Sequence, residues 1–385
     1  MKKYKLGEIC EIVSGSTPKT SIEEYWDGEV KWITPAELDD ESYIINDSVR
    51  KITELAVKKT GLSPFPEGTV ILSSRAPIGK VAIAGCEMYC NQGFKNLICS
   101  EKINNKYLFW FLKGNTSFLN SLGRGATFKE ISKKIVADIK INVPDLEQQK
   151  TVVKILERIS SLIQLRKQEI QKLEDLIRAR FVEMFGDPVC NPLRWEKKTL
   201  KEVCIKLNDG THFSPESFET GEYKYVTAKN IKMSGFDFTN ITYVPEEVHR
   251  PIYERCNPEL GDVLYIKDGV TTGIAMVNTL EEEFTLLSSV ALLKQDRRIM
   301  NGHFLSALLN DENMYTDIRS NMGGAAITRL TIAKLNTIKV ILPPIELQTQ
   351  FAAFVEQTNK SKAVIQKALD KTQLLFDSLM QKYFG

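Results

Sequence analysis

The sequence of 385 residues contains two copies of one unit, and this internal repeat limits the possible folds more than any other feature. The string Leu6-Gly-Glu-Ile-Cys10 returns as Leu200-Lys-Glu-Val-Cys204 at an offset of 194, and Met184-Phe-Gly186 returns as Tyr383-Phe-Gly385 at an offset of 199. The drift of five residues means that the copies differ only by small loop insertions. The chain is therefore predicted to fold as a duplication. Three more pairs lie between these in the same order: Lys31–Thr34 with Lys224–Thr227, Glu67–Ile71 with Leu260–Leu264, and Ile139–Gln149 with Ile338–Gln348.

Each copy begins with a part of mixed secondary structure. Short β-rich runs such as Thr69–Ser73 and Asp262–Lys267 are bounded by Gly, Pro, Asn and Asp, which favour turns. Other stretches, among them Asn105–Leu112 and His303–Leu309, have a helical pattern. This mixture predicts two related α+β globules, at residues 1–143 and 187–342.

The second part of each copy is predicted to be one long helix. Residues 144–186 and 343–385 start with proline, which suits the first turn of a helix, and then lack Gly and Pro up to the final Gly. A helix of about 40 residues is roughly 60 Å long. Apolar residues recur in a 4-3 alternation, as in helices that pack along their length, although Arg166, Lys362 and Thr372 also fall on it. The predicted helix-pairing residues are Val152, Leu156, Ile159, Ile163, Ile170, Leu173, Ile177, Phe351, Val355, Ile365, Leu369, Phe376 and Leu379.

Two arrangements would bury these apolar stripes. In one, each helix packs its stripe on its own globule. A helix of roughly 60 Å is, however, longer than a globule of roughly 140 residues, whose diameter is about 35 to 40 Å. In the other, the two helices pair and the globules lie at opposite ends, which buries both stripes along their whole length. Pairing of the helices is therefore favoured.

Composition narrows the class of protein. Hydrophobic residues make up 43% and charged residues 26%, an ordinary globular balance, and no apolar run is long enough to cross a membrane. The N-terminus reaches Glu8 before an apolar run develops, so no signal peptide is expected. Seven cysteines without a Cys-x-x-Cys pair argue against a disulfide framework and a structural zinc. We expect a cytoplasmic protein with reduced thiols.

The motifs of common catalytic sites are missing from the sequence. Gly79-Lys80 has Ser74 where a phosphate-binding loop requires glycine, and the Asn-Pro-Pro-Tyr and Phe-x-Gly-x-Gly strings of a DNA amino-methyltransferase do not occur. The three histidines, His212, His249 and His303, lack the spacing of a metal or nucleophile-base site. We therefore expect no catalytic residue, metal or cofactor in this chain. Because the formal net charge is only +2, any nucleic-acid surface must come from local clusters of cations.

Seven strings of the sequence resemble segments of known proteins: Ser14–Pro18, Glu24–Gly28, Lys31–Pro35, Pro144–Gln149, Asn208–Pro215, Tyr225–Ile231 and Pro343–Gln348. Together they resemble one known family, the specificity subunits of type I restriction-modification systems. Strings in both globules are similar to two variants of the opening of that family's target-recognition domains, and two more resemble the start of its long spacer helices. The resemblance covers the whole chain in the order globule, helix, globule, helix.

The resemblance implies a DNA-binding protein that is not an enzyme. Each globule would bind one half of a split target in double-stranded DNA, and the helices would pair as an antiparallel coiled coil that sets the separation. The helices would also dock methyltransferase subunits, two being expected, which bring S-adenosylmethionine. Restriction subunits, where present, would bring ATP and Mg. Two unlike globules at a fixed distance predict a bipartite and asymmetric target.

Polar loops at equivalent places in both copies supply candidate DNA contacts. Backbone N–H groups and cations suit phosphates, Arg75 or Arg124 suits bidentate donation to guanine, and Gln92 or Asn230 suits an adenine edge. Neutral turn formation is the alternative role for each of these loops. The candidates are Lys19, Arg75, Lys80, Gln92, Arg124, Thr127 and Lys129 in the first globule and Thr211, His212, Asn230, Lys267, Thr271, Thr272 and Arg329 in the second.

A second class of protein remains open at this point. It is a helical scaffold that binds other proteins through its helices and binds no DNA. Arginine in the polar loops of both copies favours the DNA-binding class. Salt dependence separates the two, because phosphate contacts predict an affinity for DNA that falls steeply with salt.

Overall fold

The computed structural model describes residues 2–125, 129–320 and 329–385, and the chain forms two compact units. The first unit comprises residues 1–167 and 367–385, and the second comprises residues 168–366. Two helices of 40 residues each, α6 (Leu146–Phe185) and α12 (Ile345–Phe384), run through both units. Each unit therefore contains one globule and one end of each long helix.

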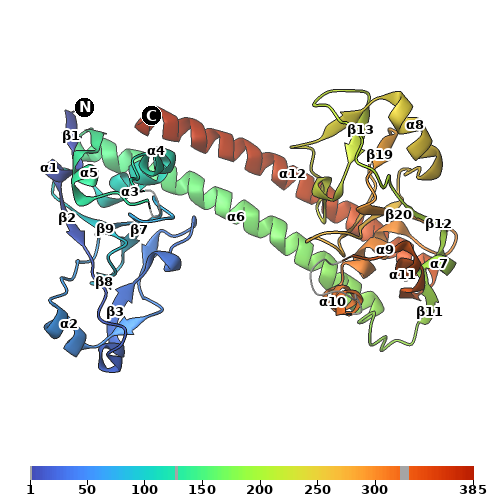
Figure 1. Ribbon diagram of the computed structural model, residues 1–385, viewed down its shortest axis with the longest axis horizontal. Helices are drawn as coiled ribbons and strands as arrows, with labels where there is room; N and C mark the ends of the chain where they lie inside the picture. The colour runs from blue at the N-terminus through green and yellow to red at the C-terminus, as the bar shows by residue number, and fades with distance from the viewer. Residues whose placement is uncertain (1, 126–128, 321–328) are drawn as a thin grey trace. The chain divides into compact units, whose positions relative to one another are not determined.

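The first globule is a mixed α+β structure (Figure 1). Its strands are β1 (Lys2–Lys5), β2 (Cys10–Ser14), β3 (Trp26–Ile33), β4 (Ile44–Ile45), β5 (Lys51–Ile52), β6 (Val70–Leu72), β7 (Val81–Ala84), β8 (Tyr89–Cys90), β9 (Lys95–Cys99) and β10 (Lys140–Val143). Its helices are α1 (Leu6–Ile9), α2 (Glu54–Thr60), α3 (Asn105–Gly114), α4 (Thr116–Ser121) and α5 (Lys133–Asp138). The strands form a five-stranded sheet in the order β2-β9-β6-β7-β4, a three-stranded sheet in the order β5-β3-β8, and the pair β1-β10.

The second globule repeats this plan. Its strands are β11 (Glu196–Thr199), β12 (Cys204–Asp209), β13 (Tyr223–Val226), β14 (Ile231–Lys232), β15 (Gly235–Phe236), β16 (Thr242–Val244), β17 (Val263–Ile266), β18 (Ala275–Val277), β19 (Phe284–Leu286), β20 (Val290–Gln295) and β21 (Lys339–Leu342). Its helices are α7 (Leu200–Val203), α8 (Glu246–Arg255), α9 (Gly302–Leu309), α10 (Glu312–Ser320) and α11 (Ile332–Thr337). The sheet orders β12-β20-β17-β18, β16-β13-β19 and β11-β21 match those of the first globule, except that β4 has no counterpart. The second globule also has a two-stranded sheet, β14-β15, that the first globule lacks among its described residues.

The ends of the long helices complete the cores of both globules. In the first unit, the core around α3 includes Leu156 of α6 and is covered by the C-terminal end of α12, where Phe376 lies 5.7 Å from Trp110 between ring centroids. In the second unit, Phe185 of α6 lies 5.6 Å from Phe351 near the start of α12. The start of one helix thus packs with the end of the other in each unit. The predicted fold class, two α+β globules with two long antiparallel helices, is confirmed.

The predicted 4-3 stripe lies on the covered side of both helices. Every one of the predicted pairing residues is buried or half-buried, from Val152 to Leu379. The first turns of each helix also pack on the adjoining globule, because Leu156 belongs to the first core and Val355 to the second. Burial on the globule and pairing of the helices therefore act together rather than as alternatives. No helix in the described ranges is long and apolar enough to span a membrane.

Polar residues replace apolar ones toward the middle of the stripe. In the first unit, Arg166 donates from Nη1 to the carbonyl of Ala368 at 2.6 Å and also to the hydroxyl of Thr372. In the second unit, Lys362 Nζ lies 2.8 Å from Glu174 Oε1. A polar residue in such a seam favours the one register that satisfies it. These contacts explain why the sequence tolerates Arg166, Lys362 and Thr372 on a stripe that is mainly apolar.

A buried glutamine anchors the start of each long helix to its globule. Gln149 Oε1 accepts from the backbone N–H of Asn104 at 2.7 Å, while its Nε2 donates to the carbonyls of Lys102 and Pro144. Gln348 makes the corresponding three bonds, to Asn301 N at 2.9 Å and to the carbonyls of Ile299 and Pro343. Both glutamines are fully buried. The repeated string that ends in Gln149 and Gln348 therefore encodes a joint between globule and helix.

Candidate nucleic-acid interface

Three polar segments of the first globule lie at one end of its main sheet. The segment after β6 is joined to the segment before α5, because Arg75 and Glu130 form a β-bridge and Ile131 N donates to Ser74 O at 2.9 Å. Arg124 also pairs with Glu130 through the backbone. The segment after β2 meets the β8–β9 connection, where the Thr17 hydroxyl donates to the side chain of Gln92. The fold therefore brings most of the candidate DNA contacts of the first globule together at one end of its main sheet.

Glu130 is the centre of this first cluster. Its carboxylate binds Arg75 through Nε at 2.9 Å and Lys95 through Nζ at 3.2 Å. The Lys95 side chain is only 8% exposed, whereas that of Arg75 is 44% exposed. Partial burial raises the pKa of Glu130, but the hydrogen bonds from Arg75 and Lys95 outweigh it and leave the pKa below its usual value. The carboxylate is therefore ionised at neutral pH.

The second globule has a cluster of charges at the same end of its sheet. Asp209, at the end of β12, is 3% exposed and lies 3.4 Å from Lys267 Nζ and 3.1 Å from His212 Nε2. Lys267 is 1% exposed and also donates to Asp268 Oδ2 at 3.0 Å. Asp268 Oδ1 in turn lies 3.2 Å from Nε of Arg329, an ion pair without hydrogen-bond geometry. The buried lysine is thus paired with two carboxylates.

Several predicted DNA contacts have internal partners that explain them without DNA. The ammonium of Lys80 donates to the carbonyls of Leu38 and Pro35, and Asn230 caps a turn through Thr227. Thr272 is fully buried and donates to Gly269 O at 2.6 Å. Thr211 and Lys267 are likewise buried. Their polar atoms shape the loops from within, and DNA contact by them stays a prediction.

Other candidates have exposed side chains. These are Lys19, Arg75, Gln92, Arg124 and Lys129 in the first globule and His212, Thr271 and Arg329 in the second. Thr127 lies outside the described residues. The exposed candidates leave a choice of cations and amides for contacts with phosphates and base edges.

Sequence reasoning missed the residues that hold the clusters together. Lys95, Glu130, Asp209 and Asp268 were not among the candidates, because the search favoured cations and amides in polar loops. The available signal was a lysine at the start of an apolar strand, Lys95 to Cys99, where a buried cation requires a carboxylate partner. The spacing of residues alone does not identify that partner.

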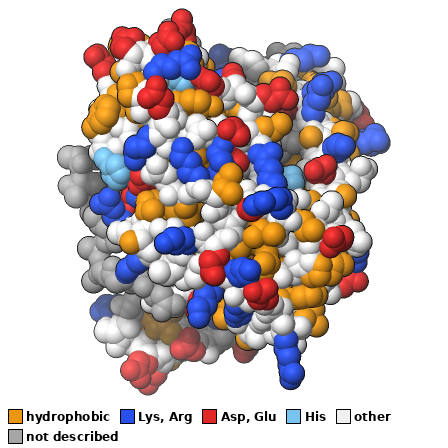
Figure 2. Space-filling model, turned by 90° about the vertical axis from the view of Figure 1, so that its right-hand side faces the viewer, with side chains coloured by type: hydrophobic (Ala, Val, Ile, Leu, Met, Phe, Trp, Pro, Cys, Tyr) orange, Lys and Arg blue, Asp and Glu red, His pale blue; other side chains and the backbone are white. Residues whose placement is uncertain are grey.

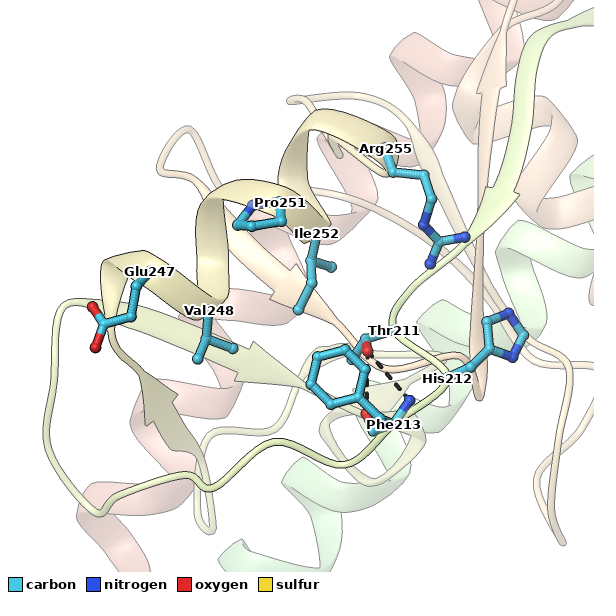
Figure 3. A pocket seen from close by; sticks show the side chains of 8 residues that line it. All are labelled: Thr211, His212, Phe213, Glu247, Val248, Pro251, Ile252 and Arg255. Carbon is cyan, nitrogen blue, oxygen red and sulfur yellow. Dashed lines mark hydrogen bonds between the residues drawn. The ribbon is translucent and has the colours of Figure 1, made fainter.

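A pocket of about 350 Å³ adjoins the second cluster (Figure 3). Figure 3 shows the ring of Phe213 beneath α8, close to Val248 and Ile252, with the guanidinium of Arg255 directed toward the segment of His212. Phe213 is 61% exposed. Arg255 donates to Gly210 O and lies 3.4 Å from Asn208 Oδ1, so its charge is held against the loop. The pocket is lined by Thr211, His212, Phe213, Glu247, Val248, Pro251, Ile252 and Arg255.

The visible surface of the second globule carries mixed charges (Figure 2). Figure 2 shows Lys and Arg side chains interspersed with Asp and Glu and with apolar patches, rather than one continuous basic face. This distribution agrees with the formal net charge of +2. Among the described residues, no group of three or more His, Cys, Asp and Glu is arranged to hold a metal. The chemistry of these loops is that of hydrogen bonding and ion pairing.

The fold and the two loop clusters define a duplicated α+β protein in which each copy ends in a long helix. Residues 1–175 and 192–372 match the family described as type I restriction modification DNA specificity domain. Because the match covers most of the sequence, the chain belongs to this family of specificity subunits, which are not enzymes. Recognition of DNA sequence within a restriction-modification system is the role of that family.

Individual relatives and solved structures agree with this assignment. The chain is 28% identical over 398 residues to the type I restriction enzyme MjaIX specificity subunit of Methanocaldococcus jannaschii, covering 98% of this chain and 91% of the relative. It is 24% identical to the EcoprrI specificity subunit of Escherichia coli, covering 91% and 86%. The crystal structure of the type I restriction-modification S subunit from M. genitalium matches with a TM-score of 0.61 at 16% identity, covering 100% of this chain and 96% of the other. A structure of a type I R-M system matches with a TM-score of 0.58 at 20% identity, covering 100% and 97%.

Proposed function

We propose that this chain reads a bipartite, asymmetric DNA target and directs methyltransferase subunits to it. The observation that carries the proposal is the pair of loop clusters at equivalent ends of the two main sheets. Each cluster has exposed cations and its own buried charges, yet the residues differ between the globules. Two related but unlike readers bind two unlike half-sites.

The long helices supply the docking surface for partner subunits in this proposal. Away from the buried stripe, apolar side chains remain exposed, including Leu165 at 54%, Leu374 at 70% and Val364 at 70%. Exposed leucine and valine on a rigid helix suit burial against another protein. Two modification subunits bring S-adenosylmethionine, and restriction subunits, where present, bring ATP and Mg. In this proposal the partner subunits carry out all of the catalysed reactions.

A salt titration tests whether the chain binds DNA or serves only as a scaffold. The full chain, assembled with its modification subunits, is titrated with a labelled duplex at several salt concentrations. We expect the logarithm of the affinity to fall linearly with the logarithm of the salt concentration, with a slope of about −0.9 per neutralised phosphate. Modification subunits without this chain serve as the control. Binding that does not depend on the chain, or that is insensitive to salt, would support the scaffold instead.

A further inference from the structure

Each globule contains a chain of ion pairs that joins a lysine, a carboxylate and an arginine, called the relay below. The three residues occupy different structural positions in the two globules. Backbone bonds establish which positions correspond, because Ile131 N donates to Ser74 O at 2.9 Å and Leu330 N donates to Lys267 O at 2.8 Å. Lys267 therefore occupies the place of Ser74. The next residues along the chain correspond too, so Asp268 stands where the first globule has Arg75. On the facing segment, Arg329 stands where the first globule has Glu130.

Each relay runs from a buried lysine through a carboxylate to an exposed arginine. In the first globule, Lys95 lies 3.2 Å from Glu130, which lies 2.9 Å from Arg75. In the second, Lys267 lies 3.0 Å from Asp268, which lies 3.2 Å from Arg329. The lysine side chains are 8% and 2% exposed, and those of the arginines are 44% and 57% exposed.

The relay keeps the same order of residue types in both globules although the residues occupy different positions in the fold. A pair that only closed the edge of the sheet has no reason to end in an exposed arginine after its two charges have changed places. Here the order lysine, carboxylate, arginine persists although the lysine lies at the start of β9 in the first globule and directly after β17 in the second, and the other two residues have exchanged segments. The shared requirement is an outward-facing guanidinium held by a carboxylate whose charge is fixed by a buried lysine.

The atoms used by the two arginines leave their terminal nitrogens available. Both Arg75 and Arg329 face their carboxylate through Nε. Among the described residues, neither makes a hydrogen bond through Nη1 or Nη2. Arg255 differs, because its two terminal nitrogens donate hydrogen bonds to Asn208 Oδ1 and Gly210 O. Arg75 donates a hydrogen bond through Nε, and Arg329 forms an ion pair through the same atom. A guanidinium that faces its carboxylate through Nε can present two parallel N–H donors from Nη1 and Nη2, which match the O6 and N7 acceptors of guanine in the major groove.

We propose that Arg75 and Arg329 each read one guanine, with Glu130 and Asp268 as the positioning residues that hold the two side chains. This inference rests on the proposed function and adds to it the base recognised and the residue that recognises it. Each half-site then contains a guanine whose N7 and O6 accept from one arginine. Arg75 lies in the segment after β6 of the first globule, and Arg329 lies in the segment before α11 of the second.

Replacing single guanines in the target tests this assignment. The complex of the full chain with its modification subunits is bound to duplexes of the methylated motif, in which each guanine in turn is replaced by 7-deazaguanine, which lacks N7. We expect one guanine in each half-site where the replacement weakens wild-type binding about tenfold or more. In Arg75→Ala the replacement at the guanine of one half-site should cost nothing further, and Arg329→Ala should behave likewise at the other half-site. Lys102→Ala and Arg298→Ala, which change exposed cations three residues beyond the far ends of β9 and β20, should keep the wild-type pattern.

Two further variants separate positioning from structural support. Glu130→Gln should reduce the sensitivity to 7-deazaguanine at the guanine assigned to Arg75, and Glu130→Asp should restore part of it. The exchange Arg75→Asp with Glu130→Arg copies the arrangement of the second globule. It should weaken binding to the parental half-site about tenfold while leaving the other half-site unchanged. Specific binding in which no guanine loses its sensitivity in Arg75→Ala or Arg329→Ala would overturn the assignment. Loss of all chain-dependent DNA binding by the wild type would instead refute the proposed function.

Discussion

Inserting seven residues after Lys167 and seven after Gln366 is expected to lengthen the unread gap in the DNA target by roughly one to three base pairs. Seven residues preserve the 4-3 phase and add about 10.5 Å to each helix. DNA rises about 3.4 Å per base pair, and the tilt of the helices to the duplex sets where in that range the gap falls. The insertion points coincide with the boundaries of the two compact units, so both cores stay intact. The helices α6 and α12 have equal lengths of 40 residues, as two paired helices that together set a fixed distance require.

Methylome sequencing of cells that express the lengthened variant measures the result. The half-site sequences should stay the same, and methylation at the parental gap should disappear. A matched control inserts three residues at both points, which shifts the apolar stripe out of phase and should abolish methylation altogether. A lengthened variant that still methylates the motif with its parental gap would show that the helices do not set the spacing.

Replacing Gln149 or Gln348 by leucine should strongly destabilise the corresponding unit. Either change leaves one N–H and two carbonyls without their partner, and in each case one carbonyl is buried while the other two groups are partly buried. Because an unsatisfied buried group costs about 1 to 3 kcal/mol, we expect the free energy of unfolding to fall by roughly 2 kcal/mol or more. Urea unfolding followed by circular dichroism measures this change. Gln148→Leu and Gln350→Leu, at exposed positions one and two residues away, should have little effect. Equal unfolding midpoints for Gln149→Leu and Gln148→Leu would contradict the role of the buried joint.

The long-range organisation was predictable because it depends on repeated and periodic features. The helix expected at 144–186 is found at Leu146–Phe185, since proline and the 4-3 stripe mark its start and length. The packing of helix ends into both globules was not predicted, because periodicity identifies an apolar stripe but not its partner. Phe351, for example, lies 5.6 Å from Phe185, about half the chain away in sequence.

The loop clusters were predictable only in outline. Polar loops with lysine or arginine pointed to the segments after β2 and β6 and before α5, which the structure brings to one end of the main sheet. Whether a side chain faces outward depends on tertiary contacts. Lys80 and Lys267 both looked like surface cations, yet the first binds backbone carbonyls and the second lies within the core against Asp209 and Asp268. Buried pairs such as Lys95 with Glu130 join segments that are distant in sequence, so composition and spacing do not reveal them.

Comparing methylomes tests the central claim most directly. Cells that carry the cognate modification subunit are sequenced with and without this chain, and methylated adenines are mapped. The account predicts one motif that is methylated only when the chain is present, with two different half-sites separated by a fixed unread gap. Identical methylomes in the two strains, or a chain-dependent motif that is contiguous or symmetric, would contradict it.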